Sequence, residues 1–524
     1  MTSGNEAKLL FYFALPMLIG NVFQQLYSTV DSIIVGRALG KNALAAVGIS
    51  FPVIFLLISL ILGVTMGTTI LIAQYYGARD MQNVKKTMDN AYIFLFFASL
   101  AITVVGLIVS KPVLILLKTP PEVLPMAKEY MDITFIGIIT AFGYNSINAI
   151  LRGLGDSKTP LLFLIIATII NIILDLIFIL VFGWGVAGAA WATVIAQGCS
   201  FAFGLYYLNR FHEVFNFNFR EMRFDREIFR LTIKIGLPTG IQQMLVGSGM
   251  TVLFRIVNSF GSSVVAAYTA ATRIDSFASM PAMNFSAAVS SFVGQNLGAG
   301  KPERVKKGFL AALGMSSVIS LAMTAITIIF GGKLVSLFNT DPEVVATGAR
   351  YLMIVGLFYI VFTAMFITNG VMRGAGDTFI PMLITLISLW LARVPASAFL
   401  SQRYGSDGIW WGIPLGWLVG TALSTGYYLT GRWKTKVVTG EREAVQDKDD
   451  DGTGQNSNLG KDEKPGETET EAKTENEAKH EETFRNNSEN WHTEQNKIAG
   501  SAGVSIGTAG KKHNGVENRG NTKT

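Results

Sequence analysis

The chain has 524 residues, of which half are hydrophobic and only 15% are charged, and its mean hydropathy of +0.40 is too high for an ordinary water-soluble enzyme. Residues 436–524 hold 13 Lys/Arg and 18 Asp/Glu, which leaves 30 basic and 19 acidic side chains in residues 1–435. The basic excess of residues 1–435 is spread among long apolar runs. This distribution excludes a nucleic-acid-binding face and favours a membrane protein with basic loops. A single cysteine, Cys199, excludes an intrachain disulfide, and with only four histidines the sequence contains no Cys/His zinc motif.

Twelve segments are long and apolar enough to cross a bilayer. A spanning helix needs about 20 mostly apolar residues, because the hydrocarbon core is about 30 Å thick and each residue rises about 1.5 Å. The segments are expected at residues 9–35, 46–73, 90–110, 130–151, 160–182, 186–208, 231–257, 264–292, 308–330, 350–371, 380–402 and 408–430. The connections are short and contain turn residues, as in Gly153–Asp156 and Gly183–Gly185. The expected fold is an all-α, multi-pass protein of the cell membrane.

The Lys and Arg residues of the loops indicate an orientation. With the N-terminus inside, 19 of them lie on the cytoplasmic side and 9 on the other, so the positive-inside rule predicts that both termini are cytoplasmic. No cleaved signal is expected before the first span, which would itself direct insertion. Residues 436–524 are rich in Glu, Lys, Asn, Thr and Gly, and we predict a disordered polar cytoplasmic tail that transport does not need; a regulatory or partner-binding tail is the alternative.

The chain repeats itself at a constant offset, which is the distance along the sequence from Gln74 to Gln295. Three groups of residues recur at this offset. The first is Gln74, Gly77 and Ala78, which recur as Gln295, Gly298 and Ala299, and the second is Thr119, Pro121, Glu122 and Tyr130, which recur as Thr340, Pro342, Glu343 and Tyr351. The third is Asn148, Arg152, Gly153, Gly155 and Asp156, which recur as Asn369, Arg373, Gly374, Gly376 and Asp377. Each copy holds six spans, an even number, so both copies sit the same way up around an axis along the membrane normal. We therefore predict an N-lobe of residues 1–220 and a C-lobe of residues 221–435, followed by the tail of residues 436–524. Rocking of two six-helix lobes about a central cavity would give alternating access.

Movement of the lobes requires an energy source. The sequence has no GxxxxGK[ST] loop for a nucleotide and no constellation that supports an enzyme, so an ion gradient remains. Ionisable groups inside a membrane are costly and mark ion pathways. Three acids lie well within the predicted spans: Asp31, Asp175 and Asp275.

Asp175 follows Asn171 by one helical turn, which places both side chains on one face of the segment 160–182. Asp31 follows Tyr27 at the same spacing in the first span, and the hydroxyl of Thr193 can add a further oxygen. Oxygen ligands suit Na⁺, and two carboxylates that share a poorly solvated pocket repel each other, so one of them can equally carry a proton. We predict that these residues form a cation-coupling site for Na⁺ or H⁺; the alternative is a pair of structural, hydrogen-bonded acids.

Asp275 allows two interpretations. Arg273 lies two residues away in the same segment, and Arg255 lies at the end of the preceding one. Asp275 and Arg273 therefore form either a structural ion pair or part of a second coupling site.

These features resemble the multidrug and toxic compound extrusion (MATE) family, whose larger superfamily also contains polysaccharide and lipid-precursor flippases. The resemblance covers residues 9–430 and leaves out the tail. It rests on Pro16, Asp31 and Gly36, on Gln295–Gly300 and its echo Gln74–Ala78, on Leu151–Asp156 and its echo Met372–Asp377, and on Gly185–Thr193.

The resemblance implies export of lipophilic, often cationic drugs in exchange for inward Na⁺ or H⁺, with small drug-like molecules and the lipid bilayer as partners, no nucleic acid and no other cofactor; we expect a monomer. It also implies that Asp31, Asn171, Asp175 and Thr193 form an N-lobe cation site. Another branch of the family has a C-lobe site on two helices that correspond to segments 231–257 and 350–371, and neither carries an acid here.

Three other functions are compatible with a large membrane protein. A major facilitator would show an acidic and basic loop between its second and third helices, which residues 76–83 do not. A lipid-linked oligosaccharide flippase needs several cations for a pyrophosphate headgroup, and only Arg255, Arg273 and Arg393 lie in or at the ends of spans; it remains the alternative function. A membrane scaffold that acts through its tail would lose its role on deletion of residues 436–524.

Overall fold

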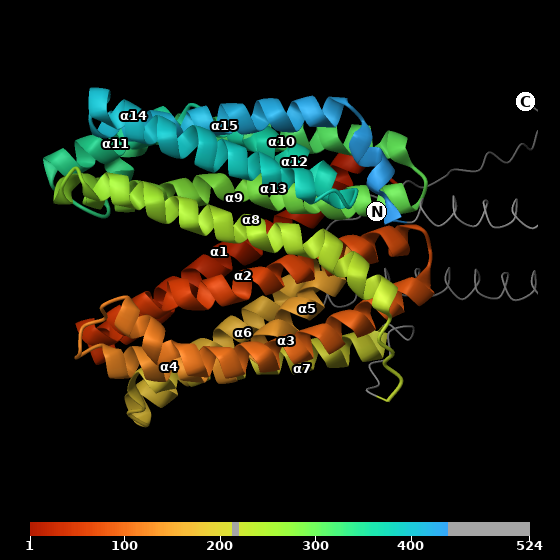
Figure 1. The fold of residues 1–524 in the computed structure, drawn as a ribbon, viewed down its shortest axis with the longest axis horizontal. Coiled ribbons are helices and arrows are strands. Elements are labelled where there is room, and N and C mark those ends of the chain that lie inside the picture. Colours follow the sequence, from red (N-terminus) through yellow and green to blue (C-terminus); the bar gives the residue numbers. More distant parts are fainter. Residues whose placement is uncertain (212–219, 439–524) are drawn as a thin grey trace, which may run out of the picture. The chain divides into compact units, whose positions relative to one another are not determined.

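The computed structural model describes residues 1–211 and 220–438, and every regular element in these two ranges is a helix (Figure 1). The N-lobe consists of α1 (Glu6–Leu39), α2 (Lys41–Gly77), α3 (Met81–Leu116), α4 (Leu124–Ile136), α5 (Ile138–Leu154), α6 (Lys158–Asp175), the π-helix η1 (Leu176–Val181) and α7 (Gly185–Phe211). The C-lobe consists of α8 (Arg226–Asn258), α9 (Ser262–Gly298), α10 (Pro302–Ser336), α11 (Pro342–Gly356), α12 (Tyr359–Gly374), α13 (Phe379–Leu386), the π-helix η3 (Ile387–Arg393), α14 (Val394–Tyr404) and α15 (Ser406–Leu429). A short 3₁₀ helix, η4 (Arg432–Lys436), follows. The predicted tail lies, from residue 439 on, outside the described residues.

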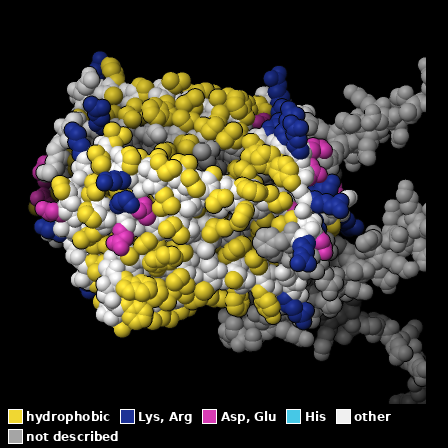
Figure 2. Space-filling view, turned by 60° about the horizontal axis from the view of Figure 1, so that its bottom comes forward, with side chains coloured by type: hydrophobic (Ala, Val, Ile, Leu, Met, Phe, Trp, Pro, Cys, Tyr) yellow, Lys and Arg dark blue, Asp and Glu magenta, His cyan; other side chains and the backbone are white. Residues whose placement is uncertain are grey.

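The helices have the lengths and apolar surfaces of membrane spans. In the described part of the chain, eight helices are long and apolar enough to cross a bilayer, and ten spans result if each of two bent helix pairs is one span. The other two spans are α9 and α15, with 37 and 24 residues, which occupy the positions of α2 and α7 one repeat later. Figure 2 shows apolar side chains over the middle of the molecule and charged ones toward its two ends. The predicted all-α fold with twelve spans in two lobes is confirmed.

The repeat is visible in the backbone. The pairs α4–α5 and α11–α12 are bent by 50° and 49°, and Gly155 and Gly376, which are equivalent positions of the repeat, have φ of +91° and +93°. This left-handed conformation after a helix favours glycine. The predicted span 130–151 is therefore broken rather than continuous. At Gly137 a Cβ would overlap the side chain of Val194, so the junction of α4 and α5 packs tightly against α7.

The first helix of each lobe, α1 or α8, begins by packing against the other lobe. Leu10 and Phe13 at the start of α1 are buried among core residues of α9, α10 and α12 in the C-lobe. In the same way, Ile228 and Ile235 at the start of α8 are buried among core residues of α2, α3 and α5 in the N-lobe. Both contacts lie at the end of the helices that carries Gly77, so the described lobes are joined at this end.

Glycines allow the backbones of α2 and α8 to touch where the lobes meet. Gly63 and Gly67 on α2 face Gly236 and Gly240 on α8, and both pairs have the GxxxG spacing typical of close helix contacts in membranes. A Cβ on Gly63 would lie 2.5 Å from the carbonyl oxygen of Gly236, and one on Gly236 would lie 2.7 Å from that of Gly63. The contact is therefore between two backbones and leaves no room for a side chain.

Asp225 caps α8 and ties it to α3. Its Oδ1 accepts hydrogen bonds from the backbone N–H groups of Glu227 (3.0 Å) and Ile228 (3.1 Å), and its Oδ2 lies 3.2 Å from Lys86 Nζ. Burial raises the pKa of Asp225, but the Ile228 N–H and Lys86 outweigh this effect, so the pKa lies below its ordinary value. A depressed pKa stabilises the fold above the ordinary value of about 4, and this stabilisation is lost as the pH falls through the folded-state value.

Asp225→Ala is expected to lower the free energy of unfolding by about 1 kcal/mol at pH 7, because the helix loses its cap. Thermal unfolding in detergent, compared between pH 3 and pH 7, measures the effect, and the difference from the wild type should shrink at the acid end. Asp225→Asn keeps an acceptor for the cap and should cost less. Identical melting of Asp225→Ala and wild type at pH 7 would show that the cap contributes nothing.

Candidate functional site

The structure brings the four predicted coupling residues together between three helices of the N-lobe. Asp31 comes from α1, Asn171 and Asp175 from the last two turns of α6, and Thr193 from α7. Asn171 and Asp175 are almost completely buried, with 1% and 0% of their surface exposed, whereas Asp31 and Thr193 are half-buried. The site therefore has a closed side at α6 and a more accessible side at α1.

The two carboxyl groups are in contact. Asp31 and Asp175 lie within hydrogen-bonding reach of each other, and the Oδ1 atom of each is buried with no partner among the described residues. Two carboxylates this close in an apolar interior repel each other, so the arrangement favours a shared proton or a bound cation. The two unpartnered oxygens are the atoms that would hold it.

Neutral oxygen and nitrogen groups complete the site. Asn171 lies one turn before Asp175; in the amide orientation that satisfies both neighbours it donates to Asp175 Oδ2 (2.8 Å) and accepts from the backbone N–H of Thr193 (3.2 Å). The Thr193 hydroxyl lies 3.2 Å from the Tyr27 hydroxyl. No cluster of three or more His, Cys, Asp or Glu side chains exists in residues 1–211 and 220–438. Two carboxylates with amide and hydroxyl groups suit Na⁺ or a proton rather than a transition metal.

The helix changes its winding directly beyond Asp175. The π-helix η1 begins at Leu176, and such turns are frequent at functional sites, because they interrupt the regular α-helical hydrogen bonds. Nothing in the sequence of this apolar run indicates it.

Tyr130 is a residue that the sequence reasoning missed. It comes from α4 and lies close enough to Asp31 and Asp175 for their charges to act on its hydroxyl. A signal was available in the repeat, because Tyr130 recurs as Tyr351, and Tyr351 donates to the buried acid of the other lobe, Asp275 (3.4 Å).

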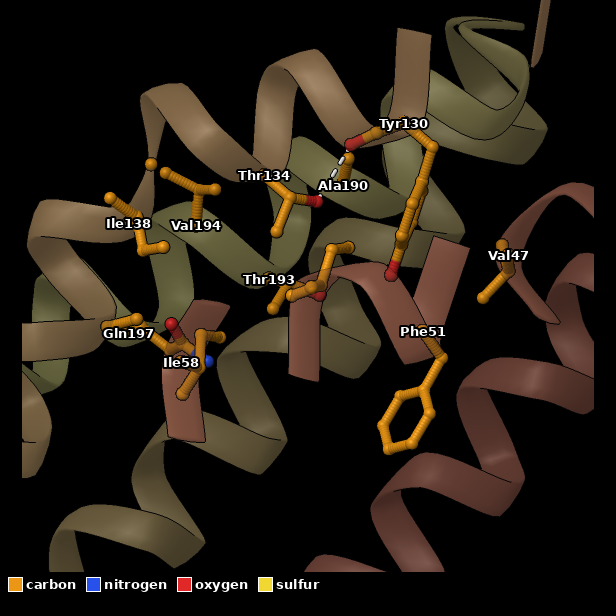
Figure 3. Close-up of a pocket in the computed structure, with 13 residues that line it drawn as sticks. Val47, Phe51, Ile58, Tyr130, Thr134, Ile138, Ala190, Thr193, Val194 and Gln197 are labelled. Carbon is orange, nitrogen blue, oxygen red and sulfur yellow. Dashed lines mark hydrogen bonds between the residues drawn. The ribbon is translucent and has the colours of Figure 1, made fainter. Parts of the chain in front are cut away.

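An apolar cavity of about 200 Å³ adjoins the carboxyl site. It lies between α2, α4, α5 and α7, and its wall is mainly aliphatic and aromatic, with no charged side chain. Figure 3 shows Tyr130 from α4, and Thr193 and Gln197 from α7, around this space. Thr193 belongs both to the cavity wall and to the carboxyl site. A lipophilic molecule in the cavity and a cation at the carboxylates would therefore share one side chain.

The C-lobe does not repeat this site. At the equivalent positions of the repeat, Asn171, Asp175 and Thr193 correspond to Ala392, Ala396 and Pro414. The two lobes thus share a scaffold but differ in chemistry.

The acid of the C-lobe, Asp275, lies in a network of tyrosines. Tyr351 donates a hydrogen bond to its Oδ2 (3.4 Å), Tyr359 lies nearby, and the cation that acts on it is the buried Arg393, at the end of η3. Arg273 is exposed, and among the described residues no ion pair within 4.0 Å joins it to Asp275. Of the two interpretations of Asp275 and Arg273, the structural ion pair is therefore not formed, because residues two apart on a helix point in different directions.

Comparison with known proteins agrees with this architecture. The MatE family model matches twice, at residues 16–177 and 238–399, once in each lobe. The chain is 37% identical to the probable multidrug resistance protein YpnP of Bacillus subtilis (strain 168), over 83% of this chain and 97% of that protein, and 27% identical to the FAD transporter of Shewanella oneidensis, over 82% and 96%. A solved structure described as the outward-facing conformation of a multidrug resistance MATE family transporter matches with a TM-score of 0.77 at 26% identity, over 83% of this chain and 97% of the other. The chain belongs to the MatE family of multidrug and toxic compound extrusion transporters.

Proposed function

We propose that this protein exports lipophilic, often cationic compounds from the cell in exchange for inward Na⁺ or H⁺, and that Asp31, Asn171, Asp175 and Thr193 bind the coupling ion. The observation that carries the proposal is the contact between the buried carboxyl group of Asp175 and the half-buried one of Asp31, each with a buried oxygen that has no partner among the described residues. Such a pair binds a proton or a cation and releases it when the pocket becomes hydrated.

Shared residues provide a physical link between ion and substrate. Thr193 and Tyr130 line the apolar cavity and lie beside the carboxylates. An ion that neutralises Asp31 and Asp175 changes how α1 packs on α6 and α7, and this change loosens a molecule held in the cavity. Exchange requires that ion and substrate favour opposite-facing states, because a ligand shifts an equilibrium only by its differential affinity.

The electrical balance fits an exchange of one cation for another. Moving one positive charge across 100 mV is worth about 2.3 kcal/mol. The entry of one Na⁺ or H⁺ therefore cancels the cost of exporting one monovalent cation against an inside-negative potential, and the concentration gradient of the ion supplies the net drive.

Polyanionic substrates fit the described residues less well. A lipid pyrophosphate or a flavin dinucleotide needs cationic side chains around it, but the cavity wall has none. Arg393 lies beside Asp275, and Arg255 and Arg273 are exposed. These contacts support a lipophilic substrate over the flippase alternative.

We place the N-lobe at residues 1–220 and the C-lobe at residues 221–435, with both chain ends in the cytoplasm and the protein acting as a monomer. On this orientation Gly77 and Gly298 lie at the cytoplasmic end. Val437 and Val438 are buried against the helices, so the packed chain continues past the predicted start of the tail.

Efflux of ethidium from energised cells tests the proposed function. Cells that carry the protein should extrude the dye faster than cells without it, and either removal of Na⁺ or a proton uncoupler should abolish the difference and so identify the ion. Equal extrusion in both strains, with the protein present in the membrane, would contradict export of lipophilic cations.

Asp275→Asn is expected to retain ion-dependent efflux, within about three-fold of the wild type, and to lower the unfolding free energy by about 1–3 kcal/mol. The amide can still accept the hydrogen bond from Tyr351, whereas Arg393 loses the nearby negative charge. Dye efflux and thermal unfolding of the same preparation measure the two effects. Loss of ion dependence in this variant would instead make Asp275 a second coupling group.

A further inference from the structure

Two glutamines at equivalent positions of the repeat lie where the lobes meet. Gln74 is on the last turn of α2 and Gln295 on the last turn of α9, and both are completely buried. Neither is among the residues of the carboxyl site, so the proposed ion binding does not account for the repeated motifs that contain them.

Each glutamine forms a hydrogen bond across the lobe interface. Gln74 Nε2, in the N-lobe, donates to the carbonyl oxygen of Gly374 in the C-lobe (3.0 Å), and Gln295 Nε2, in the C-lobe, donates to that of Gly153 in the N-lobe (2.8 Å). Gly153 and Gly374 lie in the last turns of α5 and α12, whose carbonyls have no partner within the helix. The two bonds are related by the same offset along the chain as the rest of the repeat.

Two glycines bring the backbones close enough for these bonds. A Cβ on Gly77 would overlap the carbonyl oxygen of Gln295, and a Cβ on Gly298 would overlap that of Gln74. The bonds and the glycine contacts therefore form together when the lobes close at this end, and separate together when they open.

The chain segment that follows the last span contacts the residues around the Gln74 hydrogen bond. Gln74 Oε1 accepts a hydrogen bond from the backbone N–H of Val438 (2.9 Å), and a Cβ on Gly376 would lie 2.9 Å from the carbonyl oxygen of Lys436. Trp433 in η4 is buried, with 2% of its surface exposed. The segment Arg432–Val438 therefore contacts Gln74 itself and Gly376, two residues after the Gly374 carbonyl that Gln74 binds.

We propose that Gln74 and Gln295 form a two-fold clasp that holds this end of the transport path closed, and that the segment Arg432–Val438 reinforces the clasp through Gln74. The clasp opens in each transport cycle, so the proposal rests on the proposed alternating-access function. It predicts that the two glutamines set how often the closed end opens, without affecting ion binding at Asp175.

The rate of thiol labelling beneath the clasp tests this proposal. Ser290 is buried on α9, and its hydroxyl has no partner among the described residues, so Ser290→Cys in a Cys199→Ser background costs no hydrogen bond. The reagent is a membrane-impermeant maleimide added to the clasp side of inside-out vesicles. Gln74→Ala or Gln295→Ala should each raise the labelling rate about five-fold, and the double variant should raise it more than ten-fold.

Gln242→Ala is the matched control, because Gln242 donates to Thr385 within the C-lobe (2.6 Å) and crosses no interface; its labelling rate should stay at the reference value. Val438→Pro removes the N–H that Gln74 accepts, and Val437 has the extended backbone (φ −71°, ψ 124°) that a following proline requires. This variant should raise labelling by a smaller factor than Gln74→Ala.

Unchanged labelling in the double glutamine variant would overturn the clasp, and unchanged labelling in Val438→Pro would overturn the role of the segment. If the double variant does not fold, Gly298→Ala replaces it, since its Cβ forces the same contact apart and should raise labelling at least ten-fold. Labelling needs neither dye nor ion gradient, so its outcome is independent of whether the protein exports drugs.

Discussion

Asp175→Asn is expected to reduce ion-driven dye efflux to the level of cells without the protein. The asparagine has the size of the native residue and can keep the contact with Asn171, but it carries no charge and binds neither a proton nor Na⁺. Asp31 then faces an amide rather than a second carboxylate, so the pair that shares the ion in the proposed site no longer exists. Efflux from energised cells, normalised to the amount of protein in the membrane, measures the loss.

Asp275→Asn is the matched control for this variant, because it neutralises the acid of the other lobe. The account requires a large difference between the two, with efflux lost in the first and retained in the second. If Asp175→Asn cells still extruded the dye in an ion-dependent way, the N-lobe carboxyl site would not be the coupling site.

Gly63→Val is expected to reduce efflux at least ten-fold while the protein still inserts and folds. Its Cβ would meet the carbonyl oxygen of Gly236 and the backbone nitrogen of Gly240, both at 2.5 Å. These are backbone atoms of another helix, so no side chain can move aside, and α2 and α8 must separate. The lobes then cannot close at the end near Gly77, and alternating access stops. Efflux and the yield of monodisperse protein are measured together.

Gly48→Val is the control for this substitution. Gly48 is on the same helix and exposed, and a Cβ there would meet nothing within 4 Å, so efflux should be unchanged. Normal transport by Gly63→Val would show that the close approach of α2 and α8 plays no part in the cycle.

The repeat accounts for the parts of the molecule that move, and departures from the repeat account for its chemistry. Gln74 and Gln295 are duplicated with their partners, and both copies bond across the interface. The proposed coupling residue Asp175 is not duplicated, since an alanine, Ala396, stands at the position one offset later in the C-lobe. The two lobes therefore share their arrangement of helices, but only the N-lobe contains the carboxyl site.

Apolar length and the repeat were sufficient to predict the twelve spans and the two lobes, because both depend on composition along the chain. The bend at Gly137 could not be predicted, since the packing there involves Val194, a neighbour from another helix. The same limit applies to Arg393. Four helices, α10 to α13, lie along the chain between the helix of Asp275 and the π-helix that ends at Arg393, and this π-helix has no signature in its apolar sequence.

The sequence predicts only part of the arrangement of the four residues Asp31, Asn171, Asp175 and Thr193. Helical spacing places Asn171 and Asp175 on one face, whereas the meeting of α1, α6 and α7 depends on tertiary packing that periodicity does not contain. The partner of Asp275 shows the opposite outcome, because proximity in sequence favoured Arg273, which the structure places on an exposed face.

The most direct test of the account is the binding of ethidium to the purified protein, followed by fluorescence polarisation as Na⁺ is added or the pH is lowered. The account predicts that one of these two ions releases the dye from the wild type, and that Asp175→Asn binds the dye but does not respond to either ion. Dye binding by the wild type that is indifferent both to Na⁺ and to pH would contradict the coupling of substrate release to ion binding at the carboxyl site.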